Sequence, residues 1–101
     1  MINYVKNRIE EILKSKNTVF VMFNPENLKT FNVNETNSFF LKKEKILISL
    51  EEDNKKIILK IYFSKLDKNE RFLVDLLKVF RKEFKIIDVV LVVKKFNKIN
   101  I

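Results

Sequence analysis

The chain contains no glycine among its 101 residues, and this absence limits how the backbone can turn. Glycine takes left-handed backbone conformations at little cost, so it commonly ends helices and occupies tight turns. Asparagine tolerates the same conformation better than most residues and occurs 12 times here. We therefore expect Asn17 to act as the C-terminal cap of a first helix.

The same absence removes several classes of chemistry. Glycine-rich phosphate-binding loops cannot be built without glycine. The chain also lacks histidine and cysteine, which supply the usual zinc ligands and the thiolate nucleophile. Carboxylate, lysine, serine, threonine and tyrosine chemistry remains. We expect no cofactor, no metal, no disulfide and no catalytic residue.

Length and composition predict one domain over residues 1–101. About half of the residues are hydrophobic and ten are phenylalanine, which suffices for a core without covalent staples. The first 16 residues carry six charges and no long apolar run, unlike a signal peptide. The longest apolar stretch, residues 89–93, is too short to span a bilayer. We expect a cytoplasmic protein, in a cell or an infected host, with no membrane partner.

Apolar periodicity predicts the first half of the fold. Residues 3–16 place apolar side chains at helical spacing, and residues 18–23 form a continuous apolar run typical of a buried strand. An Asn-rich loop is expected over residues 24–43. Within it, residues 24–29 favour a short helical turn, and alternation at 31–34 leaves room for an edge strand.

A hairpin is expected from residues 45–51 and 56–64. In both segments alternate residues are apolar, which predicts one buried face. The residues on that face are Ile46, Ile48, Leu50, Ile57, Leu59 and Ile61. With Asp53-Asn54 as a two-residue turn, charged and apolar partners match across the strands. The expected partners are Glu51 with Lys56 and Ile48 with Leu59.

A second helix is expected over residues 68–84, capped by Asp67 with Glu70 as its capping-box partner. Its buried stripe comprises Leu73, Leu76, Leu77, Phe80 and Phe84. A last strand is expected over residues 86–94, apolar on both faces except for Asp88. That carboxylate either reaches solvent or occupies a partnered site. Residues 95–101 are expected to fray.

These elements give an α+β fold in the order α-β-β-β-α-β, with helices packed on a mixed four-stranded sheet and an extra edge strand left open. The first and last strands are apolar on both faces, which favours a sheet with one helix on each face. The alternative places both helices on one face. It would leave Phe20, Met22, Val90 and Val92 as a patch for a homodimer or another partner.

That element order resembles the core of the PD-(D/E)xK, or restriction-endonuclease-like, nucleases. Those enzymes hold Mg²⁺ with an acid near the second strand and an acid-x-Lys pair on the third. Lys60 matches the family lysine and Glu44 is the candidate second-strand acid, but Ile58 stands where the third-strand acid should be. The resemblance covers element order and no diagnostic motif, so it implies an inactive version of the fold.

The net charge of +8 has two explanations. It can serve an acidic partner, or it can reflect an AT-rich coding sequence, which favours Lys, Asn, Ile and Phe codons. If it has a partner, the outer face of the second helix is the candidate surface, with one lysine at the end of the last strand and one at the start of the tail. The candidate partner-binding residues are Arg71, Lys78, Arg81, Lys82, Lys85, Lys94 and Lys95. Cations at the end of that helix also complement its dipole.

The expected function is that of a non-catalytic interaction protein with a protein or ribonucleoprotein partner. Small size, codon bias and the lack of motifs suggest a phage or mobile-element inhibitor of a host nucleic-acid-handling complex, including a CRISPR-type defence complex. The first alternative is a basic protein that binds nucleic acid directly through the helix face. The weaker alternative is a metal-dependent or degenerate nuclease.

Overall fold

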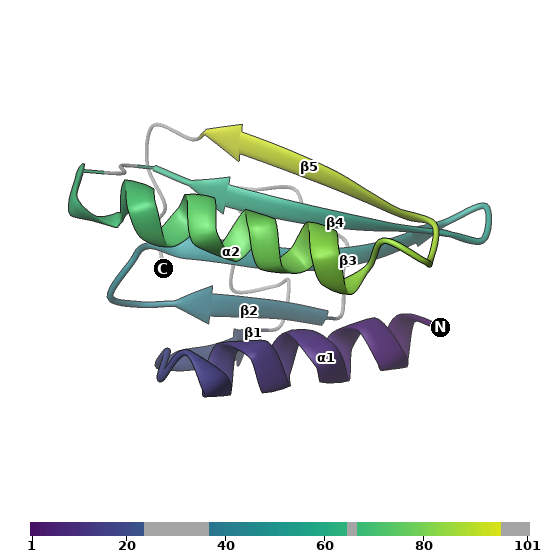
Figure 1. Cartoon of the computed structure of the whole chain (residues 1–101), viewed down its shortest axis with the longest axis horizontal. Coiled ribbons are helices and arrows are strands. Elements are labelled where there is room, and N and C mark those ends of the chain that lie inside the picture. The colour runs from purple at the N-terminus through teal and green to yellow at the C-terminus, as the bar shows by residue number, and fades with distance from the viewer. Residues whose placement is uncertain (24–36, 65–66, 96–101) are drawn as a thin grey trace.

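The computed structural model of the chain describes residues 1–23, 37–64 and 67–95, which form two α-helices and a five-stranded mixed sheet (Figure 1). The fold is therefore α+β, as expected. The elements in chain order are α1 (Ile2–Ser15), β1 (Phe20–Phe23), β2 (Asn37–Leu41), β3 (Ile46–Asp53), β4 (Lys56–Phe63), the single-turn 3-10 helix η2 (Asp67–Asn69), α2 (Glu70–Glu83) and β5 (Val89–Lys95).

The strands lie in the order β1-β2-β3-β4-β5. Neighbouring strands are antiparallel except β4 and β5, which are parallel and joined through α2. The expectation of four strands misses β2, which lies inside the predicted loop. The apolar run Phe39 to Leu41 forms this strand and is buried. The predicted helical turn at 24–29 and edge strand at 31–34 lie outside the described residues.

Both helices pack on the same face of the sheet and lie side by side on it (Figure 1). The expectation of one helix on each face is wrong. The predicted alternative patch is also split between two faces. Phe20 and Met22 pair with helix-side residues of β2, whereas Val90 and Val92 fall on the other face by strand alternation.

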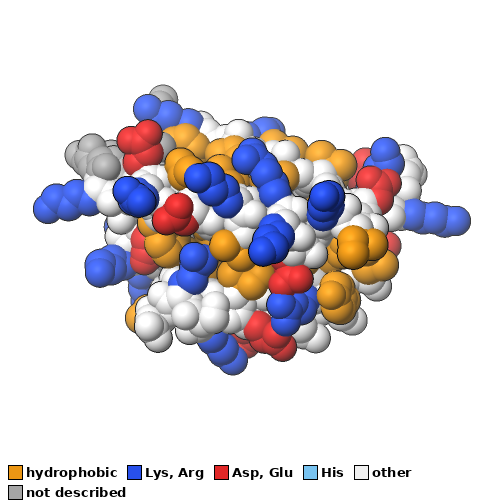
Figure 2. Space-filling model, viewed as in Figure 1, with side chains coloured by type: hydrophobic (Ala, Val, Ile, Leu, Met, Phe, Trp, Pro, Cys, Tyr) orange, Lys and Arg blue, Asp and Glu red, His pale blue; other side chains and the backbone are white. Residues whose placement is uncertain are grey.

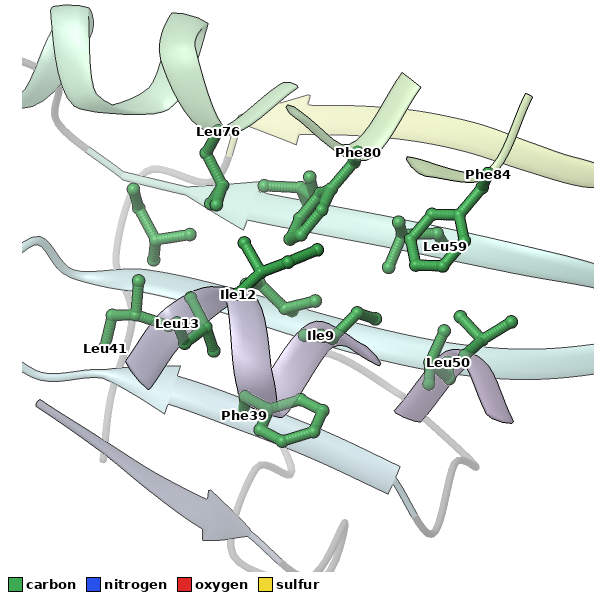
Figure 3. Close-up of a cluster of buried hydrophobic side chains, with 14 of the residues drawn as sticks. Ile9, Ile12, Leu13, Phe39, Leu41, Leu50, Leu59, Leu76, Phe80 and Phe84 are labelled. Carbon is green, nitrogen blue, oxygen red and sulfur yellow. The ribbon is translucent and has the colours of Figure 1, made fainter. Parts of the chain in front are cut away.

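A hydrophobic core fills the space between the helices and the sheet. Figure 3 shows helix side chains lying over apolar side chains of β2, β3 and β4. The labelled residues are Ile9, Ile12 and Leu13 of α1, Leu76, Phe80 and Phe84 of α2, and Phe39, Leu41, Leu50 and Leu59 of the sheet. Burying a side chain of this size contributes about 1.5–3 kcal/mol. The predicted stripe of α2 is confirmed, with Leu77 partly buried.

The outermost strands are less buried than their apolar sequences predict. Val19, just before β1, is 72% exposed, and Met22 is also exposed. In β5, Val90 and Val93 are exposed as well. Both strands are edges of the described sheet, so each has a neighbouring strand on one side only. Continuous apolar runs are instead fully buried in the inner strands, as in residues 46–48 of β3.

The β3–β4 hairpin has the predicted apolar face but a different register. Its turn residues are Asn54 and Lys55, with φ angles of 48° and 68°. Two left-handed residues form the turn type that best matches the twist of paired strands. Asp53 therefore lies opposite Lys56, and Ile48 lies opposite Ile61. The predicted turn and pairs are wrong, but the shift keeps every apolar residue on its expected face.

The helix ends show how a chain without glycine forms its caps. Asn17 is left-handed, with φ 55°, directly after α1. Its N–H bonds to the Lys14 carbonyl at 3.0 Å, and the Thr18 N–H bonds to the Leu13 carbonyl at 3.0 Å. These two bonds form a Schellman cap, which confirms the role predicted for Asn17.

The start of α2 differs from the prediction. The N-cap is Asn69 rather than Asp67, and no side chain caps the helix. The Asn69 amide instead donates to the Glu44 backbone carbonyl at 3.4 Å. This contact ties the start of α2 to the β2–β3 turn.

Candidate partner-binding surface

The solvent-facing side of α2 carries the predicted cations. Leu73, Leu76 and Phe80 are buried, so one face of α2 packs against the core. Residues three or four positions apart share a helix face, so a second set at this spacing points outward from the opposite face. All five predicted helix cations are exposed: Arg71, Lys78, Arg81, Lys82 and Lys85. Figure 2 shows Lys and Arg side chains spread along α2, with hydrophobic side chains between them and β5.

The positive charge is stronger toward the C-terminal half of α2. Asp75 lies beside Arg71 and Lys78 in an open groove of about 490 Å³ along the first half of the helix. Cations near the helix C-terminus are also favoured by the helix dipole. Arg81 and Lys82 occupy the last turn, and Lys85 follows in the adjoining turn.

A cavity of about 210 Å³ lies between the C-terminal end of α2 and strands β4 and β5. Six of its nine lining residues are apolar, and the three charged ones are Arg81, Lys85 and Asp88. The apolar lining residues are Leu59, Phe80, Phe84, Ile87, Val89 and Leu91. The cavity therefore combines apolar lining residues with two exposed cations. We call this cavity, with the exposed cations of α2, the α2–β5 surface.

Asp88 occupies the turn before β5 rather than the strand, and its side chain is exposed. The last strand begins at Val89, three residues later than predicted, because residues 84–88 form the turn that leads out of α2. Ile86 in this turn is 98% exposed. Of the two interpretations of Asp88, the structure supports the one in which the carboxylate reaches solvent, beside the cavity.

Lys94 and Lys95 lie away from the cavity. Because β5 is parallel to β4, its start lies beside the end of α2 and its end lies near the start of α2. Adjacent strand residues point to opposite faces, and Lys95 is paired with Phe63 on the helix side. The structure thus groups Arg81 and Lys85 and leaves these two lysines at the far end of the strand.

Sequence analysis missed the cavity and the exposed edge of β5. Val90 is 40% exposed and Val93 is 38% exposed, on opposite faces of the strand. Their apolar run was interpreted as a strand covered on both faces. The available signal was the position of this strand in the chain, because a last strand that follows a crossover helix is commonly at the edge of its sheet.

The residues singled out by the nuclease resemblance do not come together. Lys60 lies on the face of β4 away from the helices and forms an ion pair with Glu51. Glu44 lies in the β2–β3 turn, near Asn69 on the helix side. Within residues 1–23, 37–64 and 67–95, no three acidic side chains are grouped in a way that could hold a metal ion.

Glu44 is a buried acid with an unsatisfied oxygen. It is only 7% exposed, and its Oε2 atom has no hydrogen-bond partner in the described part of the chain. Burial raises the pKa of its carboxyl above the usual 4.5, and the charge of Lys43 partly opposes that rise. The carboxyl lines a recess of about 310 Å³ with Thr18, whose hydroxyl oxygen is also buried without a partner among the described residues.

Neither α1 nor α2 is long and apolar enough to cross a lipid bilayer. Comparisons with protein-family models, with curated proteins and with solved structures give no significant match. The α2–β5 surface is therefore the feature of the molecule from which a function can be inferred.

Proposed function

We propose that this chain is a non-catalytic binding protein whose α2–β5 surface takes an acidic segment of a partner protein. The observation that supports this most strongly is the placement of Arg81 and Lys85 beside six apolar residues on the lining of one cavity. Protein interfaces concentrate their binding energy where a buried apolar anchor is surrounded by polar contacts. A cavity of about 210 Å³ with cationic lining residues offers both in one place.

Charge also guides the approach of such a partner. The net charge of +8 and the exposed cations of α2 attract acidic surfaces and raise the association rate at low salt. Exposed acidic residues, which include Glu70, Asp75 and Asp88, interrupt the positive surface. The pattern therefore favours a partner with a short acidic segment over one with a uniformly negative face.

Direct binding of nucleic acid is the second candidate function, favoured by the cations aligned on α2. Binding of single strands usually adds aromatic side chains on which bases stack. The exposed large hydrophobic residues described on α2, its following turn and β5 are aliphatic: Val74, Ile86, Val90 and Val93. The described part of this surface thus offers cations for phosphate groups but no exposed aromatic side chain for stacking, which favours a protein partner.

The biological setting that we propose is inhibition of a host complex by a phage or mobile element. The complex would handle nucleic acid, as a CRISPR-type defence complex does. The support is the small size of the chain, its positive charge and its bias toward Lys, Asn, Ile and Phe. A non-catalytic inhibitor would act by occupying a surface that its target needs.

Affinity capture from extract of the native host tests the class of partner. One half of the extract is treated with nuclease before capture, and the captured protein and nucleic acid are both quantified. The proposal expects a protein that remains after nuclease treatment and dissociates as salt is raised. Recovery of nucleic acid alone, lost on nuclease treatment, would establish the second candidate instead.

A further inference from the structure

The geometry points to a particular binding mode: we propose that an extended acidic segment of the partner protein adds to the sheet along the outer edge of β5. This inference rests on the proposed function and specifies how the α2–β5 surface would engage its partner. Strand addition gives affinity through main-chain hydrogen bonds and specificity through alternate side chains.

The outer edge of β5 is suited to strand addition. Among the described strands, β5 pairs only with β4, so its other side has no neighbouring strand. Successive residues of a strand direct their backbone N–H and C=O groups alternately to the two sides of the strand. An edge strand therefore leaves the groups on its outer side without a partner strand. Val90 and Val93 are exposed there, which leaves apolar surface for an incoming strand to cover.

The cavity and its cations lie on the helix side of this edge. Val89 and Leu91 point toward the helices and line the cavity together with Arg81 and Lys85. In an added strand, the side chains that also point toward the helices would lie next to Val89 and Leu91. An apolar side chain there would enter the cavity, and acidic side chains two positions away would reach the two cations.

Charge selects an acidic partner over a second copy of this chain. Each copy carries a net charge of +8, and β5 itself ends in Lys94 and Lys95. Pairing β5 with its own copy would bring together two chains that each carry this net positive charge, which is unfavourable. The other edge, β1, has only four residues, so β5 with seven offers more main-chain partners.

The test uses a designed peptide of roughly nine residues, a usual strand length. Glutamate and valine alternate from a glutamate at the first position, and leucine replaces the central glutamate. Two matched peptides serve as controls: one has lysine in place of each glutamate, and one keeps every side chain but carries N-methyl groups along one edge. Binding is measured by fluorescence anisotropy, and hydrogen exchange of β5 amides reports strand pairing directly.

Strand addition predicts that the acidic peptide binds and slows exchange of alternate β5 amides. The lysine and N-methylated peptides should each bind at least about tenfold more weakly, because one lacks the charge and the other the main-chain donors. In the protein, Val90→Glu and Val93→Glu should weaken binding to a similar degree. Val19→Glu is the matched control at the opposite edge and should bind like the parent, since Val19 is exposed outside the proposed site.

Any of four results would overturn strand addition. The first is unchanged β5 exchange at about 1 mM acidic peptide, a concentration that detects even weak binding. The second is equal binding by the N-methylated peptide. The third is self-association of the parent protein that Val90→Glu abolishes, which would make a second copy the occupant. If substitutions on α2 weaken capture of the partner while the β5 substitutions do not, the proposed function stands and this binding mode alone is wrong.

Discussion

Arg8 of α1 donates hydrogen bonds to Glu83 of α2, with the Nε–Oε1 distance at 3.1 Å, and so joins the two helices above the sheet. The hydrogen bond to Glu83 raises the pKa of the Arg8 guanidinium above its usual value. The two residues are 75 positions apart. The contact can form only because both helices lie on the same face of the sheet.

A double-mutant cycle on this pair tests the helix arrangement. Arg8→Ala and Glu83→Ala should each lower the Tm slightly, and the double variant should lose less than the sum of the two. The Lys14–Glu10 pair, at 3.3 Å within α1, provides a local control that does not depend on where α2 lies. Strictly additive losses for Arg8 and Glu83 would contradict the contact between the helices.

The hairpin turn provides a second prediction. Lys55 adopts φ 68°, a left-handed conformation that costs a residue with a side chain more than it costs glycine. Lys55→Gly would also create Asn-Gly, the preferred pair for this turn. We expect a gain of about 0.5–1 kcal/mol in the free energy of unfolding, measured in urea.

The control for this gain is Lys56→Gly, one residue further along. Lys56 belongs to β4 and lies opposite Asp53, so glycine there should destabilise the hairpin. A loss of stability in Lys55→Gly together with a gain in Lys56→Gly would place the turn elsewhere.

The buried carboxyl of Glu44 should make the free energy of unfolding depend on pH. Its folded-state pKa is raised by burial, so the folded protein binds a proton more tightly than the unfolded chain does. The sign follows from linkage: this group favours folding most below pH 4.5, and stability is lost as pH rises through the folded-state pKa. Glu44→Gln should therefore be more stable than the parent at pH 7, with a smaller difference at pH 4.

The matched control for Glu44 is Glu52→Gln on the exposed end of β3, which removes the same charge outside the core. It should leave the stability difference between pH 4 and pH 7 close to that of the parent. If Glu44→Gln lowers stability at pH 7, the buried carboxylate has a stabilising partner, and the unsatisfied oxygen is not a cost.

The sequence was informative where local chemistry decides the structure. Helical periodicity located both helices to within a few residues, and the absence of glycine singled out Asn17 as a cap. Alternation identified the buried face of the hairpin. The register was not determined by the same pattern, because a shift of the turn to Asn54-Lys55 keeps the apolar faces intact.

The order of the strands in the sheet could not be predicted from local sequence patterns. An apolar run such as residues 89–93 looks the same in an inner strand and in an edge strand, and only the sheet order separates them. The exposed cations of α2 were predictable from helical spacing. The cavity beside Arg81 was not, because its lining combines α2, the turn that follows it and two strands.

The absence of nuclease activity is a further prediction. Lys60 is ion-paired with Glu51 on one face of the sheet, while Glu44 lies near Asn69 on the helix side. Mg²⁺-dependent cleavage needs oxygen ligands gathered around one ion. Purified protein with Mg²⁺ or Mn²⁺ should leave plasmid DNA and single-stranded RNA intact. Metal-dependent cleavage that disappears in Glu44→Ala or Lys60→Ala protein would contradict this.

The charge of α2 can be tested separately from the net charge of the chain. Replacing Lys78, Lys82 and Lys85 with glutamine lowers the net charge from +8 to +5, and replacement with glutamate lowers it to +2. Replacing the exposed lysines Lys42, Lys45 and Lys55 with glutamine also gives +5 but leaves α2 unchanged. Exposed substitutions of this kind usually change stability little, and circular dichroism verifies the fold of each variant.

The most direct measurement is the affinity of the captured partner protein for these three variants and the parent, at one fixed salt concentration. The α2–β5 surface predicts that the glutamine variant of α2 binds at least about tenfold more weakly than the parent, and the glutamate variant more weakly still. The control with the same net charge should bind like the parent. If both α2 variants stay folded and bind as tightly as the parent, the partner does not use this surface, and codon bias becomes the better explanation of its charge.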